Sequence, residues 1–229
     1  MTSNIPLDNN WTAMYILLDK SASMASLQPE NTAKQVNDLV HEQQNGRVTV
    51  TAATFSNKYN IVKKNVNGPD FTITAEDIHP EGCTALQESL CRLIDDAGHE
   101  LEKMKDVRPG RVIVIVLTDG QENASTGEYS GQSGQKILSE KIKHQQEVYN
   151  WIFYFLGTNI DAITTGKSYG IDTRTCINYA SSKEGCTAVL KSASSALNRA
   201  RNNNFNNREE SLNQCAFTLE ERNRSNTYI

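Results

Sequence analysis

Five oxygen-bearing side chains occur at three places in the sequence with the types and spacing that metal chemistry requires. Asp19, Ser21 and Ser23 alternate at a spacing of two, and Thr84 and Asp119 belong to two later segments. In an extended turn, a spacing of two can point three side chains into one pocket. Two carboxylates and three hydroxyls form an all-oxygen set, which suits a hard divalent cation: Mg²⁺ first, with Mn²⁺ or Ca²⁺ as alternatives.

Each of these segments also has an ordinary structural explanation. A serine after a strand is often only a helix N-cap, and an Asp-Gly pair such as Asp119-Gly120 is a common turn. The three segments nevertheless occur together, each at the end of a predicted strand or the start of a predicted helix. This combination favours a metal site formed by Asp19, Ser21, Ser23, Thr84 and Asp119.

The elements that would position these residues alternate between strands and helices. Continuous apolar runs at Ala13–Leu18, Arg111–Leu117 and Trp151–Leu156 predict strands that are buried on both faces. The alternation predicts an α/β fold, a doubly wound and mostly parallel sheet with helices on both faces and one antiparallel edge strand. The binding crevice of such a sheet lies outside the carboxyl ends of its strands. The remaining expected strands are Val48–Phe55, Tyr59–Val66 at the edge and Thr175–Asn178, and the expected helices are Pro29–Gln44, Thr84–Lys105, Lys136–Tyr149, Asp161–Tyr169 and Lys183–Arg199.

Composition sets the domain count and excludes several function classes. The chain has 229 residues, 38% of them hydrophobic, which is enough for one buried core. We expect a single domain over residues 1–200 and a polar, Asn-rich tail over 201–229 that is loosely attached or disordered. The net charge is −4, from 23 basic and 27 acidic residues. Without a basic excess, binding to nucleic acid is not expected.

The cysteines and the termini bear on location. The five cysteines are widely spaced and form no C-x-x-C pair, so buried, reduced thiols are expected. The first ten residues lack the features of a signal peptide, and no apolar run is long enough to cross a bilayer. We therefore expect a cytoplasmic protein without a membrane partner.

The pattern D-x-S-x-S, then a threonine, then an aspartate followed by glycine resembles the metal-ion-dependent adhesion site (MIDAS) of von Willebrand factor type A (vWA) domains. The resemblance covers roughly residues 11–197, and all five motif positions match. More narrowly, the chain resembles the short stand-alone vWA proteins of bacteria and phages. The shared phrases are Leu18–Met24, Gly82–Leu86, Leu117–Asn123 and Phe153–Asp161. Two positions depart from the usual glycines, Ala22 and Cys83, and both substitutions are small.

The resemblance implies a function as well as a fold. In that family the hydroxyls, here Ser21, Ser23 and Thr84, bind the metal directly, and the two aspartates act partly through water. The metal keeps much of its electrophilic character and binds an Asp or Glu carboxylate of a partner protein. The resemblance therefore implies a non-catalytic protein-binding module. The polar loop over 121–134 would rim the site, and its glycines suggest that it moves.

Other interpretations were weighed against this one. Gly166-Lys167-Ser168 resembles the end of a phosphate-binding loop, but Asp161 stands where the first glycine is needed, so nucleotide binding is not expected. Asp19 could be the nucleophile of a Mg²⁺-dependent phosphoester hydrolase, although such enzymes usually carry a second aspartate where Ser21 stands. A metal-free scaffold is the third alternative.

Overall fold

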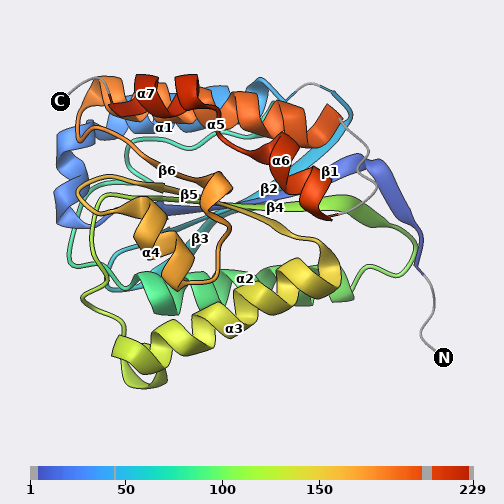
Figure 1. The fold of residues 1–229 in the computed structure, drawn as a ribbon, viewed down its shortest axis with the longest axis horizontal. Coiled ribbons are helices and arrows are strands. Elements are labelled where there is room, and N and C mark those ends of the chain that lie inside the picture. The colour runs from blue at the N-terminus through green and yellow to red at the C-terminus, as the bar shows by residue number, and fades with distance from the viewer. Residues whose placement is uncertain (1–4, 44, 203–207, 227–229) are drawn as a thin grey trace.

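The computed structural model describes residues 5–43, 45–202 and 208–226, and its centre is one six-stranded sheet (Figure 1). The strand order is β3-β2-β1-β4-β5-β6, with β2 and β3 antiparallel and the other neighbouring pairs parallel. The sequence prediction of a mostly parallel sheet with one antiparallel edge strand is confirmed. The strands are β1 (Leu7–Asp19), β2 (Arg47–Phe55), β3 (Tyr59–Asn67), β4 (Arg108–Thr118), β5 (Ile152–Gly157) and β6 (Cys176–Asn178).

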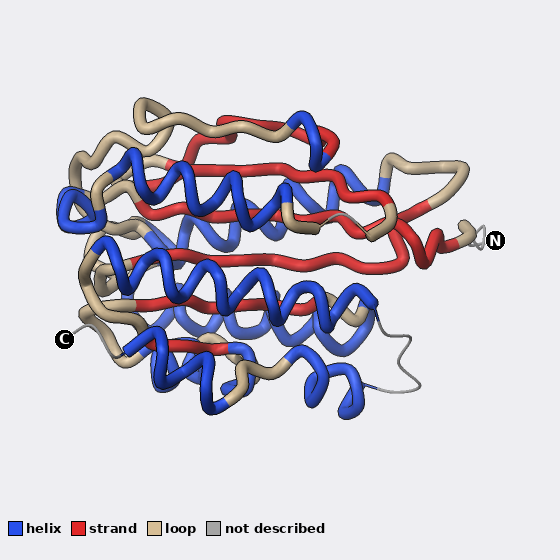
Figure 2. The backbone as a smooth tube through the Cα atoms, turned by 90° about the horizontal axis from the view of Figure 1, so that it is seen from above, coloured by secondary structure: helices blue, strands red, loops and turns tan. Residues whose placement is uncertain are grey.

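Helices cover both faces of this sheet, as a doubly wound fold requires (Figures 1 and 2). One face carries α1 (Pro29–His41) and α5 (Lys183–Asn202), and the other carries α2 (Leu86–Glu102), α3 (Gly131–Tyr149) and α4 (Ala162–Ser168). Two apolar cores result, because successive side chains of a strand point to opposite faces. The prediction of a doubly wound α/β fold is therefore confirmed.

The central strands are long because they are buried on both sides. In β1, every residue from Trp11 to Asp19 is buried, which extends well beyond the apolar run 13–18. The register pairs Asp19 with Phe55 of β2 and Leu18 with Leu117 of β4. The carboxyl ends of β1 and β4 therefore lie side by side, which brings the residues after them to one edge of the sheet.

Among the helix boundaries that differ from the sequence prediction, the starts of α2 and α3 lie near that edge. Helix α2 begins at Leu86, so Thr84 lies in the preceding loop instead of the first turn. Helix α3 begins at Gly131, whose φ of +58° suits glycine, and this is five residues before the expected start at Lys136. The last four residues of the expected polar loop, 131–134, are consequently helical.

The C-terminal segment is packed onto the domain where it is described, which differs from the loose attachment that we expected. Residues 208–226 form α6 (Arg208–Cys215) and α7 (Leu219–Asn226), which lie along α5 (Figure 1). The side chains of Leu212, Cys215 and Phe217 are buried, and the Tyr154 hydroxyl donates to the Cys215 carbonyl at 3.0 Å. A few apolar side chains at suitable positions therefore hold a segment of polar composition. The expectation for residues 203–207 and 227–229 lies outside the described residues.

Most of the cysteines lie in the core, as free thiols. All five cysteines are free thiols; Cys91, Cys176, Cys186 and Cys215 are buried, but Cys83 is exposed, contrary to the packed thiol that we expected. Within the described ranges, no helix combines the length and the apolar character needed to span a bilayer.

Candidate metal centre

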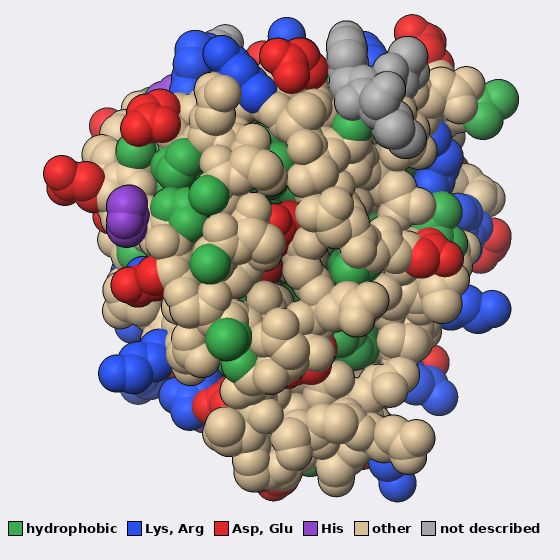
Figure 3. All heavy atoms as spheres, turned by 90° about the vertical axis from the view of Figure 1, so that its left-hand side faces the viewer, with side chains coloured by type: hydrophobic (Ala, Val, Ile, Leu, Met, Phe, Trp, Pro, Cys, Tyr) green, Lys and Arg blue, Asp and Glu red, His purple; other side chains and the backbone are tan. Residues whose placement is uncertain are grey.

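The structure brings all five predicted ligands to one edge of the sheet. Asp19 is the last residue of β1, and Ser21 and Ser23 lie in the turn after it. Asp119 directly follows β4, and Thr84 lies two residues before α2. Figure 3 looks onto this edge, where acidic side chains are visible between neutral ones near the centre of the face. This is the edge at which parallel α/β sheets place their binding sites.

Hydrogen bonds connect the first turn to the end of β4. The Ser23 hydroxyl donates to Asp119 Oδ1 at 2.7 Å, and it lies 3.2 Å from the Ser21 hydroxyl. The Ser21 backbone N–H donates to Asp19 Oδ1 at 2.7 Å, which fixes the turn that presents both serines. Asp119, Ser23, Ser21 and Asp19 therefore form one continuous polar chain.

Thr84 completes the set from a third segment. A Cβ added to Gly120 would lie 3.0 Å from Thr84 Oγ1 and 3.7 Å from Ser23 Oγ, so the space next to position 120 borders both hydroxyls. Thr84 is held by a reciprocal pair of bonds: its N–H donates to Asn123 Oδ1 at 2.8 Å, and the Asn123 N–H donates to the Thr84 carbonyl at 3.0 Å. Glycine at position 120 therefore keeps a side chain from crowding the Thr84 hydroxyl.

Burial dominates the electrostatics of the two aspartates. Each has only 1% of its surface exposed. Burial raises the pKa of Asp19 above its ordinary value, and hydrogen bonds from Thr118 and Ser21 act against this rise. Burial and, to a smaller extent, the nearby charge of Asp19 raise the pKa of Asp119 to about 6, although the Ser23 hydrogen bond opposes this rise. Two carboxylates in a buried pocket favour a bound cation.

The donor set fits a hard divalent cation. Asp119 Oδ2 is buried, and no described residue gives it a hydrogen-bond partner. A buried carboxylate oxygen of this kind is costly unless a proton or a cation neutralises it. No cluster of three or more His, Cys, Asp or Glu side chains suited to a metal occurs in the described ranges. A metal at this edge would therefore depend on the serine and threonine hydroxyls as well as the two aspartates.

Several supporting residues were not identified from the sequence. The Thr118 hydroxyl donates to Asp19 Oδ2 at 2.6 Å, so both oxygens of that carboxylate are engaged. Glu122 accepts from the N–H groups of Gln87 at 2.7 Å and Ser125 at 2.8 Å, which places a carboxylate at the start of α2. The first part of the loop that we expected to move is thus hydrogen-bonded to α2. These residues lie in or next to the phrase 117–123, but their roles depend on partners that are distant in sequence.

The rim of the site carries an ion pair and a thiol. Lys20 Nζ lies 2.5 Å from a carboxylate oxygen of Glu81, and the Glu81 N–H donates to the Lys20 carbonyl at 2.7 Å. The exposed Cys83 is held through its backbone, whose N–H donates to Asn57 Oδ1 at 2.9 Å. Both departures from the usual motif, at 22 and 83, lie on exposed positions and leave the polar chain intact.

The phosphate-loop resemblance has a packing explanation. Gly166 belongs to α4, and a Cβ added there would lie 2.4 Å from Cys176 Sγ. The glycine therefore allows α4 to approach β6, and Lys167 and Ser168 are the last residues of a short helix. A phosphate loop would instead place these residues at the start of a helix.

Comparison with known proteins gives matches at the level of structure. No family model matches the sequence, and no curated protein matches it. Proximal thread matrix protein 1 from the mussel byssus, in a structure with a zinc-occupied MIDAS motif, is similar at 19% identity and a TM-score of 0.56, over 82% of this chain and 46% of that one. A von Willebrand factor type A protein from Catenulispora acidiphila is similar at 13% identity and a TM-score of 0.54, over 87% and 52%. The PilB minor pilin from Streptococcus sanguinis is similar at 11% identity and a TM-score of 0.55, over 86% and 62%.

These similarities define the fold. The chain has the fold of a von Willebrand factor type A domain, which confirms the fold that the sequence resemblance implied. It spans about half the length of the solved chains that it matches. At these identities, the comparison concerns the architecture, and the chemistry of the edge has to be argued from the residues themselves.

Proposed function

We propose that this protein is a binding module that uses a divalent cation to capture an Asp or Glu carboxylate of a partner protein. The observation that carries the proposal is the constellation of Ser21, Ser23, Thr84, Asp19 and Asp119 at the carboxyl edge of a vWA fold. The zinc in the MIDAS motif of the mussel protein supports a divalent cation for this fold. Mg²⁺ is the first expectation because all the donors are oxygens, with Mn²⁺ or Ca²⁺ as alternatives.

The proposed roles follow from the donors. The hydroxyls of Ser21, Ser23 and Thr84 would bind the cation directly, and the two aspartates would act partly through water. Such a set places little negative charge on the cation, which therefore keeps its attraction for a carboxylate from outside. Gly120, beside Thr84 and Ser23, leaves this side of the site without a covering side chain.

The geometry supports binding more than hydrolysis. A phosphatase nucleophile needs a carboxylate oxygen that can attack the substrate. Asp19 is 1% exposed, and its two oxygens accept from the Ser21 N–H and the Thr118 hydroxyl. Asp19 is therefore better suited to orienting neighbouring groups than to covalent attack.

Metal binding is tested by calorimetry with Mg²⁺ and Mn²⁺. The double variant Ser21→Ala with Ser23→Ala should lose binding and keep the fold. Ser26→Ala is the matched control, because Ser26 lies in the same turn region with an exposed hydroxyl bonded to the Ser23 carbonyl and Ser181. Absence of binding to the wild-type protein at millimolar metal would overturn the metal site.

Partner capture is tested separately by pull-down with Mg²⁺ and with a chelator. A true partner should be retained only with Mg²⁺ and should be lost with the Ser21/Ser23 double variant. Replacing one acidic residue of the captured partner by its amide should abolish retention. Retention that is equal with chelator would contradict metal-dependent capture even if the metal binds.

A further inference from the structure

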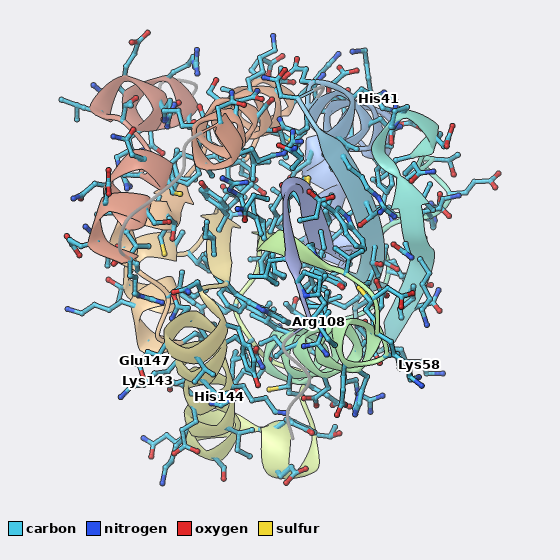
Figure 4. All side chains as sticks on the ribbon, turned by 90° about the vertical axis from the view of Figure 1, so that its right-hand side faces the viewer. His41, Lys58, Arg108, Lys143, His144 and Glu147 are labelled. Atoms are coloured by element: carbon cyan, nitrogen blue, oxygen red, sulfur yellow. The ribbon has the colours of Figure 1, made fainter. Side chains whose placement is uncertain are left out.

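A second polar pocket lies at the opposite edge of the sheet. Its cavity of about 250 Å³ is lined by two arginines, Arg111 and Arg201, and by side chains of four asparagines, Asn9, Asn10, Asn45 and Asn202. It lies where β1 and β4 begin and where α5 ends; Figure 4 looks onto this edge, with Arg108 at the start of β4 labelled. Thr12, which also lines it, is seven residues before Asp19 in β1, or about 23 Å at 3.3 Å per residue.

Arg201 forms the inner wall of this pocket. Only 7% of the residue is exposed, and its guanidinium donates to Thr12 Oγ1 at 3.2 Å, to Gln43 Oε1 at 3.4 Å and to the Asn45 carbonyl. Three of its five N–H groups are thus fixed on neutral oxygens. These hydrogen bonds hold the guanidinium in place, but because their acceptors are neutral they do not balance its positive charge.

A carboxylate would normally compensate a buried guanidinium, and none does so for Arg201. Among the described residues, no Asp or Glu forms a salt bridge with it. The residues outside the described ranges contain no Asp or Glu either. An uncompensated charge in a buried position is costly, and acidic side chains of this chain do not offset that cost.

The second guanidinium increases the positive potential. Arg111 lines the same cavity, and its N–H donates to the Asn9 carbonyl at 2.5 Å. Burial, together with the smaller effect of the Arg111 charge, lowers the pKa of Arg201 to about 10. Two like charges therefore face a shared polar cavity.

We propose that this pocket binds a small oxyanion of the size and charge of inorganic phosphate or sulfate. Guanidinium groups bind such anions through paired, charge-assisted hydrogen bonds. The Asn45 amide already donates to Asn202 Oδ1 at 3.1 Å, so further neutral donors would come from the amides of Asn9, Asn10 and Asn202. The cavity is smaller than the roughly 300–1,000 Å³ of pockets that hold drug-sized ligands, so a small ion fits it better. The site is independent of the proposed metal centre, because it shares none of its residues.

The competing explanation is structural. Arg201 links the loop before β2 to the end of α5, and this link alone could account for its burial. In that case anions would have no specific effect. Arg111→Gln separates the two explanations, because it removes one guanidinium from the cavity and leaves all the bonds of Arg201 in place.

The test measures phosphate and sulfate binding to the metal-free protein by calorimetry and by thermal unfolding, with chloride at equal ionic strength as the reference. We expect saturable binding of at least one of the two anions and a Tm rise of about 3 °C or more at ten times the Kd. Arg111→Gln should lose most of that rise. Arg92→Gln, which removes an exposed arginine paired with Glu88 on α2, should keep it. The proposal is overturned if neither anion binds saturably to the wild-type protein. It is equally overturned if Arg111→Gln lowers Tm by the same amount in all buffers and keeps the wild-type response to the anion.

Discussion

Asp119 carries the largest electrostatic cost of the metal-free site. One of its oxygens is buried without a hydrogen-bond partner among the described residues, and its pKa is raised to about 6 by burial and by Asp19. We expect Asp119→Asn to stabilise the metal-free protein by about 1 kcal/mol at pH 7.5, because the variant removes a buried charge next to a like charge. Urea unfolding in the presence of a chelator measures this gain.

The same variant should respond to pH in a defined direction. A carboxyl group whose folded pKa lies above its unfolded value destabilises the fold once it is ionised, so the cost is present above pH 6 and disappears near pH 4. The gain from Asp119→Asn should therefore shrink as the pH falls from 7 to 4. Binding of Mg²⁺ should be lost at every pH. If the variant is less stable than the wild type at pH 7.5 with chelator, the ionised Asp119 carboxylate does not destabilise the fold.

At the level of single residues, the sequence predicts the candidate metal ligands better than the residues that hold those ligands in place. The placement of Asp19, Ser21, Ser23, Thr84 and Asp119 at one edge could be expected, because the carboxyl ends of parallel strands share an edge. The Thr118 bond to Asp19 and the caps formed by Glu122 and Asn123 could not, because each depends on a partner that the register of the sheet and the start of α2 bring close. The role of Asp19, Ser21, Ser23, Thr84 and Asp119 as metal ligands remains a prediction.

At the level of elements, continuous apolar runs predicted the buried strands correctly, but the polar composition of the C-terminal segment did not predict how it packs. The strands β1, β4 and β5 follow from runs that must be buried on both faces. The segment 208–226 is mostly polar, and its buried apolar side chains (Leu212, Cys215 and Phe217) are too few to form a recognisable helical stripe in the sequence. The low hydrophobicity of the tail therefore predicted a loose attachment, although a few well-placed contacts are enough to hold it against the domain.

Phe217 is the contact through which this segment can be tested. Its ring is 5% exposed and packs edge-on against Tyr154, with ring centres 5.5 Å apart. Phe217→Ala should lower the free energy of unfolding by about 3 kcal/mol, since it removes a buried aromatic side chain. Leu219→Ala is the matched control, because Leu219 is 75% exposed and should change stability by less than about 0.5 kcal/mol. Equal, small effects of the two variants in chemical unfolding would mean that the segment does not contribute to the core.

Glu221 on α7 gives the segment a pH dependence. Burial would raise its pKa, but hydrogen bonds from Arg199 and Thr218 outweigh burial, and the net pKa lies below 4.5. A carboxyl group with a lowered folded pKa stabilises the fold above its unfolded pKa, and this contribution is lost as the pH falls through the folded pKa. Glu221→Gln should therefore cost about 1–2 kcal/mol at pH 7 and much less at pH 3.

This comparison has its own control on the same helix. Glu220 is exposed, so Glu220→Gln should leave stability unchanged at both pH values. Urea unfolding of the two variants and the wild type at pH 7 and pH 3 measures the difference. A cost for Glu221→Gln that is the same at both pH values would indicate lost packing and not a lost ion pair.

At the scale of the whole molecule, the two proposed sites lie at opposite edges of one sheet. They share β1, yet about 23 Å of buried strand separates Thr12 from Asp19. Binding to each site stabilises the folded state by an amount set by ligand concentration and Kd. Contributions from sites this far apart, without common contacts, usually add to within about 0.5 kcal/mol.

We therefore expect the stabilisation by Mg²⁺ and that by sulfate to be additive. The measurement is the free energy of unfolding with neither ligand, with each alone and with both, at constant ionic strength. Additivity would show that the sheet is a rigid spacer and that the proposed metal site works independently of the proposed anion pocket. A deviation beyond about 0.5 kcal/mol would contradict this and would require an element that contacts both edges to change position on binding. Helix α5 is the element to examine in that case, because it ends at Arg201 and begins near Ser181, whose hydroxyl lies 3.2 Å from that of Ser26 in the turn after β1.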